Sequence, residues 1–522
     1  MPLYPLVSGL LTGLVDLGGT LLVIPLMLPV TGLLLILAIG GRYAGRVVLV
    51  LLPLGLAAAA AVVAAFWETG DALYYQLGGW APPLGVALKA DGLSAVLLLT
   101  SAIVILAVGV YAQRTFRASQ GASETRTSLV FWLLFCGVWG GLNLVFVSQD
   151  LFNLFVALEL LTFSAVPLVS LDGRGETIAA ALRYLLFALL GSVLYLLGAV
   201  LFYGTYGTLD IALLADQIAR VNPLPAAVIA AAALMTAGLL AKTALFPLHL
   251  WLPPAHAGAP PAASALLSAL VVKASFFLIL RIWFDLMPVL LTQMGAQVLG
   301  ALGVAAILYG GLLALRQGRL KLLVAYSTLA QLGYLFLVFP LAIGPGAARS
   351  ASLVAAPGVL TGGMLQLVSH AFAKAAMFMA AGMIAAALGQ DQIRKLAGIG
   401  RALPITVLAF GIGGLALTGL LPSGAYLAKT LLDGAAAESG QWWWSLAMQA
   451  GGLLTAAYLI RVFYHALSGF GEPPVLRARP ARYQELVVLG LALCSILLGL
   501  LPSAMLALPE LGRVAAVVTE TP

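Results

Sequence analysis

The sequence predicts an all-α integral membrane protein with about 14 transmembrane helices. Of its 522 residues, 62% are hydrophobic and only 9% are charged, and the mean hydropathy is +1.08. Soluble domains carry about 25% charged residues. Apolar stretches recur from end to end, each long enough to cross a hydrocarbon core of about 30 Å as a helix. A transmembrane barrel would need segments of about ten residues with alternating hydrophobicity, and these segments are longer and continuously apolar.

Fourteen spans are expected, and the connections between them are short. No polar tract or change of composition marks a soluble domain, so residues 1–522 are expected to form one polytopic membrane domain. Residues 1–20 contain Asp16 and several glycines and are expected to lie at the membrane interface. They lack the basic region of a cleaved signal peptide. The spans are predicted near residues 21–40, 47–66, 92–111, 128–147, 151–171, 178–203, 224–250, 262–284, 289–315, 321–343, 359–388, 403–432, 443–467 and 484–507.

Lys and Arg are distributed unequally between the two sides of the predicted bundle. Even-numbered connections hold little beyond Lys89, Arg220 and Arg349. Positive residues in short loops stay cytoplasmic. Both termini are therefore expected on the outer, periplasmic side of a prokaryotic inner or plasma membrane, and this asymmetry accounts for the net charge of +7 without a nucleic-acid partner. The odd-numbered connections hold Arg42, Arg46, Arg114, Arg117, Arg126, Arg174, Arg316, Arg319, Lys321, Arg394, Lys395, Arg401, Arg477, Arg479 and Arg482.

Two predicted spans are interrupted by Gly and Pro. The stretches AGLLAKTALFPLHLWLPP, from residue 237, and GLALTGLLPSGAYLAKTLL, from residue 414, both contain Ala-Lys-Thr and lie five spans apart. An odd separation gives two five-helix units of opposite orientation, as in inverted-topology transporters, and we expect these repeats over residues 128–284 and 289–467. Backbone groups freed by proline are tolerated at membrane depth only where protein or water supplies partners. The broken helices therefore predict a wet interior.

Charged side chains recur inside the predicted spans. Each costs about 2.5–3.5 kcal/mol at the centre of a bilayer, so a row of them must face polar groups or water. Arg183, Arg281 and Arg461 lie near predicted helix ends, where a structural role, as a packing ion pair or as a side chain reaching the interface, explains them as well as a role in proton movement does. Mid-span lysines cannot reach the interface cheaply. The row consists of Glu159, Arg183, Lys242, Lys273, His370, Lys374, Lys429, Arg461 and His465.

The residue types in this row suit proton transfer. Burial favours release of a proton from a lysine, and a nearby carboxylate opposes that release. If Glu159 approaches Lys242, the lysine stays charged; if the pair separates, the proton can pass to another basic group. His370 and Lys374 are four residues apart and therefore share one helix face. Lys and His joined by water can form a relay, whereas arginine hardly deprotonates.

No other chemistry is indicated by the sequence. There is no phosphate-binding or dinucleotide-binding glycine motif and no nucleophile elbow. The four histidines lie on separate segments, and Cys136 and Cys494 are far apart, so no metal site, disulfide or iron–sulfur cluster is expected. We expect no cofactor and no bond chemistry in this chain itself. His249 and His256 flank Trp-Leu-Pro-Pro at a break, where a structural role fits them as well as a functional one.

The motifs resemble those of the antiporter-like proton-translocating subunits shared by respiratory complex I, membrane-bound hydrogenases and Mrp-type cation/proton antiporters. The resemblance covers most of the chain. The order of the matching stretches is specific. The Glu-bearing segment is followed by the broken seventh helix and then by the eighth, tenth and eleventh helices. The stretches are GWAPPLGVALKADGLS, NLFVALELL, AKTALFPLHLWLPPAHAGAPPAASALLSALVVKAS, AYSTLAQLGYL, SHAFAKAAMFMAAG and QDQIRKLAGIG.

The resemblance implies a role for each residue of the row. Glu159 and Lys242 would form the family's Glu–Lys pair and Lys273 its central relay lysine. His370 and Lys374 would be the basic groups of the eleventh helix, and Lys429 the exit lysine of the broken twelfth. Supporting positions would be Arg183, His256 and His465. Two stretches depart from the family pattern. Pro254 stands where an acid often follows Trp-Leu-Pro, which bears on a loop contact, and GLLPSGAYLAK differs from the usual Pro-Pro-x-Ser-Gly-Phe, which bears on the shape of the exit half-channel.

Several functions remain compatible with the sequence. The first is a proton-conducting subunit coupled to Na⁺ or K⁺ exchange in an Mrp-like complex. The second is a proton-pumping subunit of a complex I-like NADH:quinone oxidoreductase or a membrane-bound hydrogenase. A third is a membrane partner of an inorganic-carbon uptake protein, and a fourth is a scaffold that conducts nothing. The expected partners are homologous antiporter-like subunits and small membrane subunits. The chain ends soon after its fourteenth span, so the smaller members of the family are the expected relatives.

Overall fold

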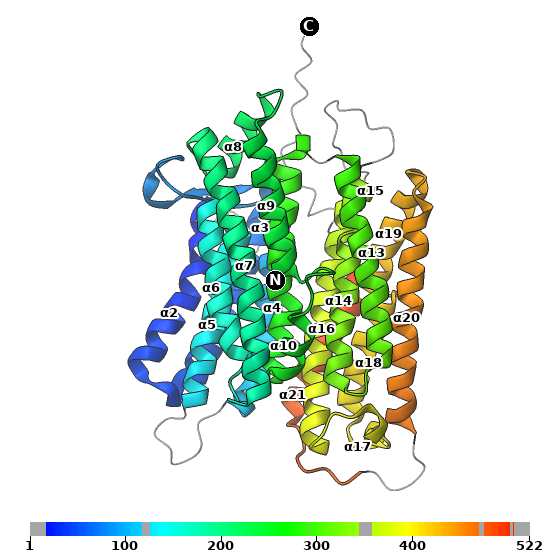
Figure 1. Cartoon of the computed structure of the whole chain (residues 1–522). Helices are drawn as coiled ribbons and strands as arrows, with labels where there is room; N and C mark the ends of the chain where they lie inside the picture. Colours follow the sequence, from blue (N-terminus) through cyan, green and yellow to red (C-terminus); the bar gives the residue numbers. More distant parts are fainter. Residues whose placement is uncertain are drawn as a thin grey trace, which may run out of the picture.

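A computed structural model describes residues 17–116, 126–290, 292–343, 358–468, 474–501 and 505. It is a bundle of long, roughly parallel helices (Figure 1). Within the described residues, thirteen helical segments are long and apolar enough to cross a membrane. Both termini, most of the expected interfacial segment, Arg117 and Arg349 lie outside the described residues.

The thirteen segments coincide with thirteen of the fourteen predicted spans. In the first half they are α2 (Val23–Ile39), α3 (Gly41–Thr69), α4 (Gly92–Thr115), α5 (Arg126–Val147), α6 (Leu151–Val169), α7 (Gly175–Tyr206), α9 (Ala226–Thr243) and a continuous rod of α11 (Pro261–Leu266), η3 (Leu267–Val271), α12 (Val272–Arg281) and η4 (Ile282–Leu286). In the second half they are α13 (Gln293–Arg316), α14 (Leu320–Leu335) continued by α15 (Val338–Ala342), α16 (Val359–Leu388), α20 (Trp442–Leu467) and α21 (Arg482–Leu497), extended by η7 (Leu498–Leu500).

The fourteenth predicted span, residues 403–432, is two shorter helices, α18 (Pro404–Thr418) and α19 (Gly424–Glu438). The other short elements are η1 (Gly18–Leu22), β1 (Leu73–Gln76), η2 (Leu77–Gly79), β2 (Ala87–Ala90), α8 (Ile211–Ala219), α10 (Leu252–Gly258), η5 (Pro288–Leu290), η6 (Ile393–Lys395) and α17 (Ile399–Ala402). The predicted fold class, a helical membrane bundle with two interrupted spans, is confirmed.

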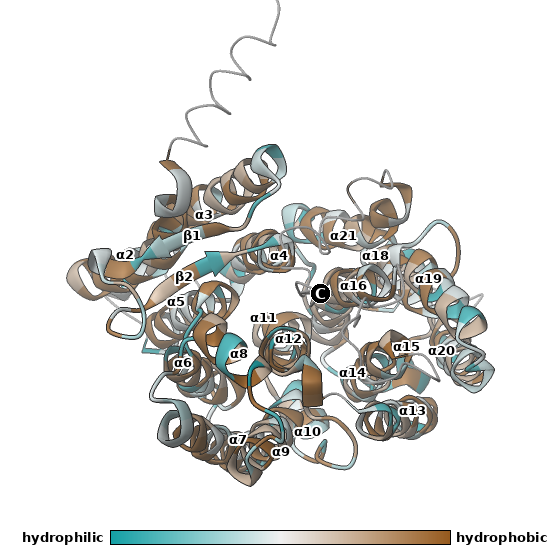
Figure 2. Ribbon diagram, turned by 90° about the horizontal axis from the view of Figure 1, so that it is seen from above, coloured by the Kyte–Doolittle hydropathy of each residue, from teal (hydrophilic) through white to brown (hydrophobic). Residues whose placement is uncertain are grey.

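The rod from α11 to η4 forms the centre of the bundle. Its most apolar stretch is completely buried, whereas those of α2, α20 and α21 are only one-third buried. Seen from above, α6, α12, α16 and α19 follow one another from one edge of the bundle to the opposite edge (Figure 2). These four helices carry most of the predicted relay residues, so the row crosses the bundle rather than running along one helix.

A hairpin of β1 and β2 lies at one end of the bundle, beside α4 and α5. The strands pair antiparallel with Leu73 opposite Ala90, and a bridge from Leu88 to Ser148 joins the hairpin to the start of α6. The end with the hairpin and α8 carries Lys89 and Arg220, and the opposite end carries most of the loop arginines. The charge asymmetry predicted from the sequence is therefore an asymmetry between the two ends of the bundle.

A buried ion pair joins α4 to α12 near the hairpin. Arg281 donates to both carboxylate oxygens of Asp91, with Nη2 2.6 Å from Oδ1, and also to Asp285 Oδ2 at 2.7 Å. Its Nη2 also donates to Ser94 Oγ at 2.8 Å, and that hydroxyl donates to the Phe146 carbonyl on α5 at 2.5 Å. Burial opposes ionisation of Asp91, but the guanidinium and the Ser94 N–H outweigh it and hold the pKa of Asp91 far below its usual range. Of the roles left open for Arg281, the structure supports the packing ion pair.

Two carboxylates face each other at the same end of the bundle. Asp150 and Asp210 form an isolated antiparallel bridge. The Leu151 N–H donates to the Leu209 carbonyl, and the Ile211 N–H donates to the Gln149 carbonyl. Asp150 and Asp210 are therefore a non-hydrogen-bonded pair. Side chains of such a pair are close together. Asp210 caps α8 through Oδ1, and its buried Oδ2 has no hydrogen-bond partner among the described residues. Burial, reinforced by Asp150, raises the pKa of Asp210, although backbone N–H groups and Lys89 oppose the shift.

We expect Arg281→Ala to be strongly destabilising. Removing one partner of a buried pair leaves a buried charge uncompensated, which costs about 3–5 kcal/mol. Thermal unfolding of the purified protein in detergent measures the loss. Arg220→Ala is the matched control, because Arg220 pairs with Asp216 on the exposed surface, with side-chain exposures of 74% and 57%, and such pairs contribute about 0–1 kcal/mol. Equal losses for the two variants would contradict the role of the ion pair.

We expect Asp210→Asn to stabilise the protein at neutral pH. Asn caps a helix about as well as Asp, and the change removes a like-charge contact of about 0.2–1 kcal/mol. Because the pKa of Asp210 is raised by folding, the folded state gains stability when this group is protonated. The gain in stability of the variant over the wild type should therefore shrink as the pH falls through the raised pKa of Asp210. Melting temperatures from pH 8 to pH 4 test this, with the exposed Asp216→Asn as the control that should show no such trend.

Candidate functional site

The first broken helix, α9, ends directly after Lys242. Ala244 has a positive φ of 59°, which turns the chain out of the helical path. The Trp251 indole N–H donates to the Ala241 carbonyl at 2.9 Å, and the Leu245 N–H donates to the Leu240 carbonyl at 3.2 Å. Carbonyls at the end of a helix lack helical partners, and these donors supply them inside the membrane-spanning layer. The break is thus stabilised without exposing the backbone to lipid.

Lys242 faces Glu159 across α6 and α9. Its Nζ lies 3.5 Å from Glu159 Oε1 and donates to Thr162 Oγ1 at 2.9 Å. The Ser192 hydroxyl on α7 donates to the same carboxylate oxygen. The side chains of Lys242 and Glu159 are only 5% and 16% exposed. The Glu–Lys pair expected from the sequence is therefore a buried contact, long enough to be loose and held by hydroxyl groups on two helices.

Two glycines bring α7 and α9 together beside this pair. A Cβ on Gly191 would lie 2.6 Å from the Gly238 carbonyl oxygen and 3.0 Å from Lys242 Cγ, and a Cβ on Gly238 would lie 2.3 Å from the Gly191 carbonyl oxygen. Distances this short exclude any larger residue without a shift of the backbone. Close packing of α7 on α9 through small residues therefore sets where Lys242 can point.

Lys273 follows a π-helical turn in the central rod. The turn η3 covers Leu267–Val271, and Lys273 Nζ donates to the Ser268 carbonyl at 2.7 Å. The Ser268 hydroxyl in turn shares a hydrogen bond of 2.8 Å with Thr328 on α14. Lys273 is 1% exposed, and no carboxylate pairs with it among the described residues. π-turns occur frequently at functional sites.

Lys374 and His370 lie on α16 beside Lys273. Lys374 Nζ donates to the Ser327 hydroxyl and to the Val324 carbonyl at 3.1 Å. Both residues are completely buried, and neither ring nitrogen of His370 has a hydrogen-bond partner among the described residues. The charge of Lys273 is close enough to act on Lys374, His370 and His256. These four side chains form the central basic cluster.

His256 reaches the central basic cluster from α10, the helix beyond the first break. It is completely buried, and its ring lies beside Trp251 and Phe378, with centroid distances of 6.2 and 5.9 Å. His249, by contrast, contacts Phe246 and Tyr309, with ring centroids 5.5 and 5.0 Å away. Of the two histidines that flank the Trp-Leu-Pro-Pro sequence, only His256 joins the cluster in the part of the chain that is described.

The second break repeats this arrangement with different donors. At the end of α18, the Thr418 carbonyl accepts from Lys429 Nζ at 2.9 Å, and the Leu417 carbonyl accepts from Gln331 Nε2 at 3.3 Å. Gly419 has a φ of +84°, and a Cβ there would lie 2.8 Å from Lys429 Cδ, so only glycine leaves room for the lysine. Gln366 on α16 extends this network by donating to Gln331 Oε1 at 2.8 Å.

Lys429 has two further neighbours that sequence reasoning missed. Its Nζ lies 4.6 Å from the centroid of the Tyr334 ring, within the range of a cation–π contact. Asp433 lies one turn further along α19, near enough for its charge to act on Lys429, and accepts from Gln449 Nε2 at 3.1 Å. The spacing of four residues between Lys429 and Asp433 on one helix is the signal that could have identified Asp433.

Lys321 departs from its predicted position. The sequence predicts a cytoplasmic loop for it, but it lies in the first turn of α14, is 8% exposed and donates to the Ala259 carbonyl at 2.5 Å. Its neighbour Arg319 remains exposed and pairs with Asp391 at 3.1 Å. The side chain of a lysine directly before an apolar run can point into the bundle or stay in the loop. Counting the charges in each loop cannot distinguish these two positions.

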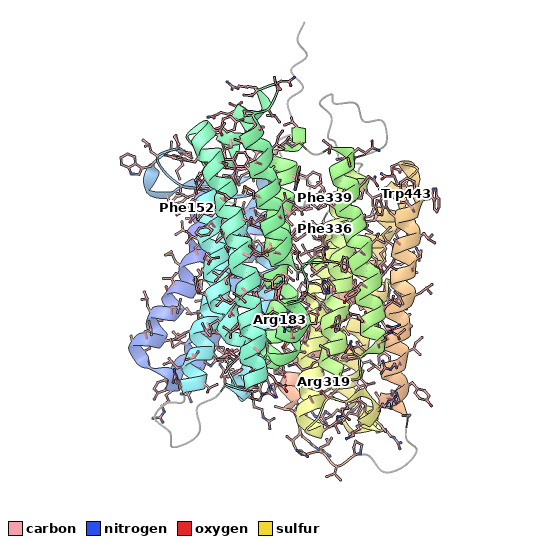
Figure 3. The ribbon with its side chains drawn as sticks, viewed as in Figure 1. Phe152, Arg183, Arg319, Phe336, Phe339 and Trp443 are labelled. Atoms are coloured by element: carbon pink, nitrogen blue, oxygen red, sulfur yellow. The ribbon has the colours of Figure 1, made fainter. Side chains whose placement is uncertain are left out.

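Two supporting residues lie away from the central basic cluster. Arg183 is exposed on α7 and is seen at the front of the bundle, in the half toward Arg319 (Figure 3). His465 lies in the last turn of α20, half-buried beside Tyr464. The Arg461 guanidinium donates to the Leu315 carbonyl near the end of α13, which is a packing contact. None of these three touches the relay residues on α6, α9, α12, α16 or α19.

The six residues expected to carry protons, together with His256, thus form three groups in sequence across the bundle. The first surrounds Glu159 and Lys242, the second is the central basic cluster, and the third surrounds Lys429. Within the described ranges, no direct hydrogen bond joins Lys242 to Lys273, and the central cluster contains no carboxylate. Such an arrangement can hold and transfer protons through small side-chain movements or bridging water.

Comparisons with known proteins identify the family of this chain. Residues 148–455 match the family model described as NADH:quinone oxidoreductase/Mrp antiporter, transmembrane. The chain is 35% identical over 437 residues to NADH-quinone oxidoreductase subunit N of Desulforudis audaxviator, covering 81% of this chain and 83% of that one. It is 29% identical over 396 residues to a subunit of the Na⁺/H⁺ antiporter of Bacillus subtilis, covering 76% of each.

A solved structure shares the fold over most of this chain. A chain of the Mrp complex from Dietzia sp. DQ12-45-1b superposes with a TM-score of 0.82 at 24% identity, over 95% of this chain and 97% of that one. The family model covers more than half of the chain, and the relationship to the Desulforudis protein extends over four-fifths of it. The chain therefore belongs to the NADH:quinone oxidoreductase/Mrp antiporter family of transmembrane proteins.

Proposed function

We propose that this chain is a proton-translocating, antiporter-like subunit of a multi-subunit membrane complex. Protons would move along Glu159, Lys242, Lys273, His370, Lys374 and Lys429. The observation that carries the proposal is the central basic cluster, where Lys273 and Lys374 are completely buried and bonded to carbonyl and hydroxyl oxygens rather than to carboxylates. A scaffold has no use for ammonium groups at that depth, where each is costly.

The loose Glu159–Lys242 contact would act as the switch of the relay. While the carboxylate lies beside Lys242, it favours the charged lysine. A small movement of α6 relative to α9 would remove that support and allow a proton to leave toward the central basic cluster. Lys242 is directly followed by the break in α9, so a local change in the turn can shift its side chain without moving the whole helix. On the other side, Lys429 stands at the second break and would pass protons to one membrane surface.

Orientation and partners form part of the same proposal. Because basic residues gather at the end opposite the hairpin, that end would face the cytoplasm, and the hairpin and α8 would face the periplasm of a prokaryotic cell. Partners would be homologous antiporter-like subunits and small membrane subunits, since the similar Dietzia chain belongs to an Mrp complex. The exposed apolar surface of α7, which carries Arg183, is available for such contacts.

The coupled reaction has two candidates. We favour Na⁺ or K⁺ exchange, as the name of the Bacillus relative describes Na⁺/H⁺ exchange for that protein. The second candidate is proton pumping driven by electron transfer in other subunits, and the 35% identity to a subunit of an NADH-quinone oxidoreductase supports it. Mass spectrometry of the purified complex separates them. Companion antiporter subunits would support the first, and redox subunits with iron–sulfur clusters would support the second.

We expect Lys242→Ala and Glu159→Ala to abolish proton-coupled transport while the complex still assembles. Each change removes one member of the pair that controls proton release. Proton movement in vesicles containing the reconstituted complex, followed with a pH-sensitive dye, measures the loss, and blue native gels report assembly. Lys395→Ala and Glu176→Ala are matched controls on exposed positions and should transport normally. Wild-type rates in the first two variants would refute the assignment.

We also expect Lys273→Arg to lose transport. Arginine keeps the positive charge but hardly releases its proton. The substitution should therefore block a proton relay, whereas it would preserve a role that needs only a fixed charge. The same vesicle assay applies, with the exposed Lys395→Arg as the control for the exchange of residue type. Retained transport by Lys273→Arg would mean that Lys273 acts only through its charge, and the relay through this position would be abandoned.

A further inference from the structure

A cavity of about 510 Å³ lies on the side of the bundle, apart from the row of relay residues. Residues 60–68 of α3, 96–103 of α4 and 364–372 of α16 contribute its walls, and Leu498, Leu501 and Met505 close one side. Figure 2 shows α4 between α3 and the pair α16 and α21. The lining residues Ala60, Trp67 and Glu68 are exposed, so the cavity opens to the surroundings of the protein.

The lining of this cavity is almost entirely apolar. Its walls hold one hydroxyl, that of Thr100, which donates to the Val96 carbonyl on its own helix at 2.7 Å. The one charged lining residue is Glu68. A cavity without available polar partners does not hold water well, and a polar ligand would lose its own hydrogen bonds there. The chemistry of the walls fits a hydrocarbon chain.

The depth and length of the cavity match one leaflet of a bilayer. From Ala60 to Glu68, α3 rises about 12 Å, close to half of a hydrocarbon core of about 30 Å. Glu68 is next to the last residue of α3, and Trp67 beside it is 43% exposed. Trp is enriched where the hydrocarbon meets the headgroups. The charged end of the cavity thus lies at headgroup level and the apolar part extends into the membrane.

The charge at the rim selects among headgroups. Glu68 and nearby Asp71 are both acidic and exposed, and no Lys or Arg lines the cavity in the described part of the chain. A carboxylate accepts hydrogen bonds, and a primary ammonium group offers three N–H donors, whereas a quaternary ammonium offers none. An anionic headgroup would be repelled. The rim is complementary to the ethanolamine headgroup.

We propose that this cavity binds one phosphatidylethanolamine from the leaflet on the hairpin side, with one acyl chain between α3, α4 and α16 and the ammonium at Glu68. The lipid would be a structural ligand of the subunit. The proposal rests on the membrane-spanning fold and not on the proposed ion coupling, so lipid binding and transport can fail independently.

Lipid in this cavity would pack against the face of α16 that lies opposite its relay residues. Met364, Val368 and Phe372 of α16 line the cavity, and they recur every four residues along one face. Gln366, His370 and Lys374 are offset from them by two residues and therefore lie on the opposite face. An acyl chain would fill the space behind α16 and limit the movement of the helix that carries the central basic cluster.

Headgroup competition on the wild-type complex tests the proposal without any variant. The purified complex is stripped of loosely bound lipid in detergent, incubated with equal amounts of phosphatidylethanolamine, phosphatidylcholine and phosphatidylglycerol of the same acyl chains, and analysed by native mass spectrometry. We expect phosphatidylethanolamine to be retained in preference to the other two. Equal retention of all three lipids, or none, would overturn the headgroup assignment.

Variants then locate the bound lipid. Ala64→Phe fills the cavity, and because acyl-chain affinity grows steeply with each buried methylene, retention should fall by about ten-fold or more. Leu54→Phe is the matched control, since Leu54 is on the same helix and 52% exposed but does not line the cavity. Glu68→Gln should keep the lipid but lose the preference for ethanolamine. Size-exclusion profiles and melting curves confirm that each variant is folded.

Two outcomes would overturn the site. Unchanged retention by Ala64→Phe would place the lipid elsewhere on the complex. A photoreactive amino acid introduced at Val63, which lines the cavity, should label lipid in the intact complex. Labelling of a companion subunit, or of this chain's own C-terminal residues, would show that a polypeptide occupies the cavity instead. Neither outcome depends on whether the complex transports ions.

Discussion

The structure depends on one constraint, which is that backbone N–H and C=O groups cannot remain without partners inside a hydrocarbon layer. The two broken helices show how the chain meets it. The Ala241 carbonyl accepts from the Trp251 indole, and the Thr418 carbonyl accepts from Lys429. The breaks are therefore possible only where polar side chains approach from neighbouring helices. The same requirement that stabilises the backbone also brings lysine and glutamine side chains into the middle of the bundle.

Buried charge takes two different forms in this protein. Arg281 is neutralised by two aspartates in short, multiple hydrogen bonds, an arrangement that holds helices together and leaves no proton to exchange. Lys273 and Lys374 are instead held by single carbonyl and hydroxyl oxygens, which can accept from an ammonium and can remain in place beside a neutral amine. Whether a buried charge forms a structural ion pair or a site of proton exchange therefore depends on its partner atoms and not on its depth of burial.

Much of the architecture could be predicted from the sequence, because apolar length alone defines a spanning helix. The fourteen spans, both breaks and the depth of Lys273 follow from that reasoning. Orientation about each helix axis could not be predicted, because a helix that is apolar on every side has no period to mark its inner face. Arg183 is consequently exposed although its position within a span places it with the relay, and Lys321 is buried although its position before a span places it in a loop.

The aspartate partner of Arg281 was also beyond the sequence. Asp91 and Arg281 are 190 residues apart, and nothing local links them. The Ala-Lys-Thr tripeptide shared by the two breaks does not mark equivalent positions. Lys242 precedes its break, whereas Lys429 follows its own, so the two lysines approach the interrupted backbone from opposite sides. The inverted repeats over residues 128–284 and 289–467 remain a prediction, which rests on the odd separation of the two breaks, five spans apart.

The π-turn at Leu267–Val271 constrains how this helix can change during evolution. A wide turn holds about one residue more than a regular α-helical turn. Losing that residue would give a more regular helix with better backbone geometry, but every side chain beyond it would rotate by about 100° around the axis. Lys273 would then leave the Ser268 carbonyl and turn toward another neighbour. The irregular turn thus fixes the angular register of the central lysine, and a length change in this segment is tolerable only if a second change restores that register.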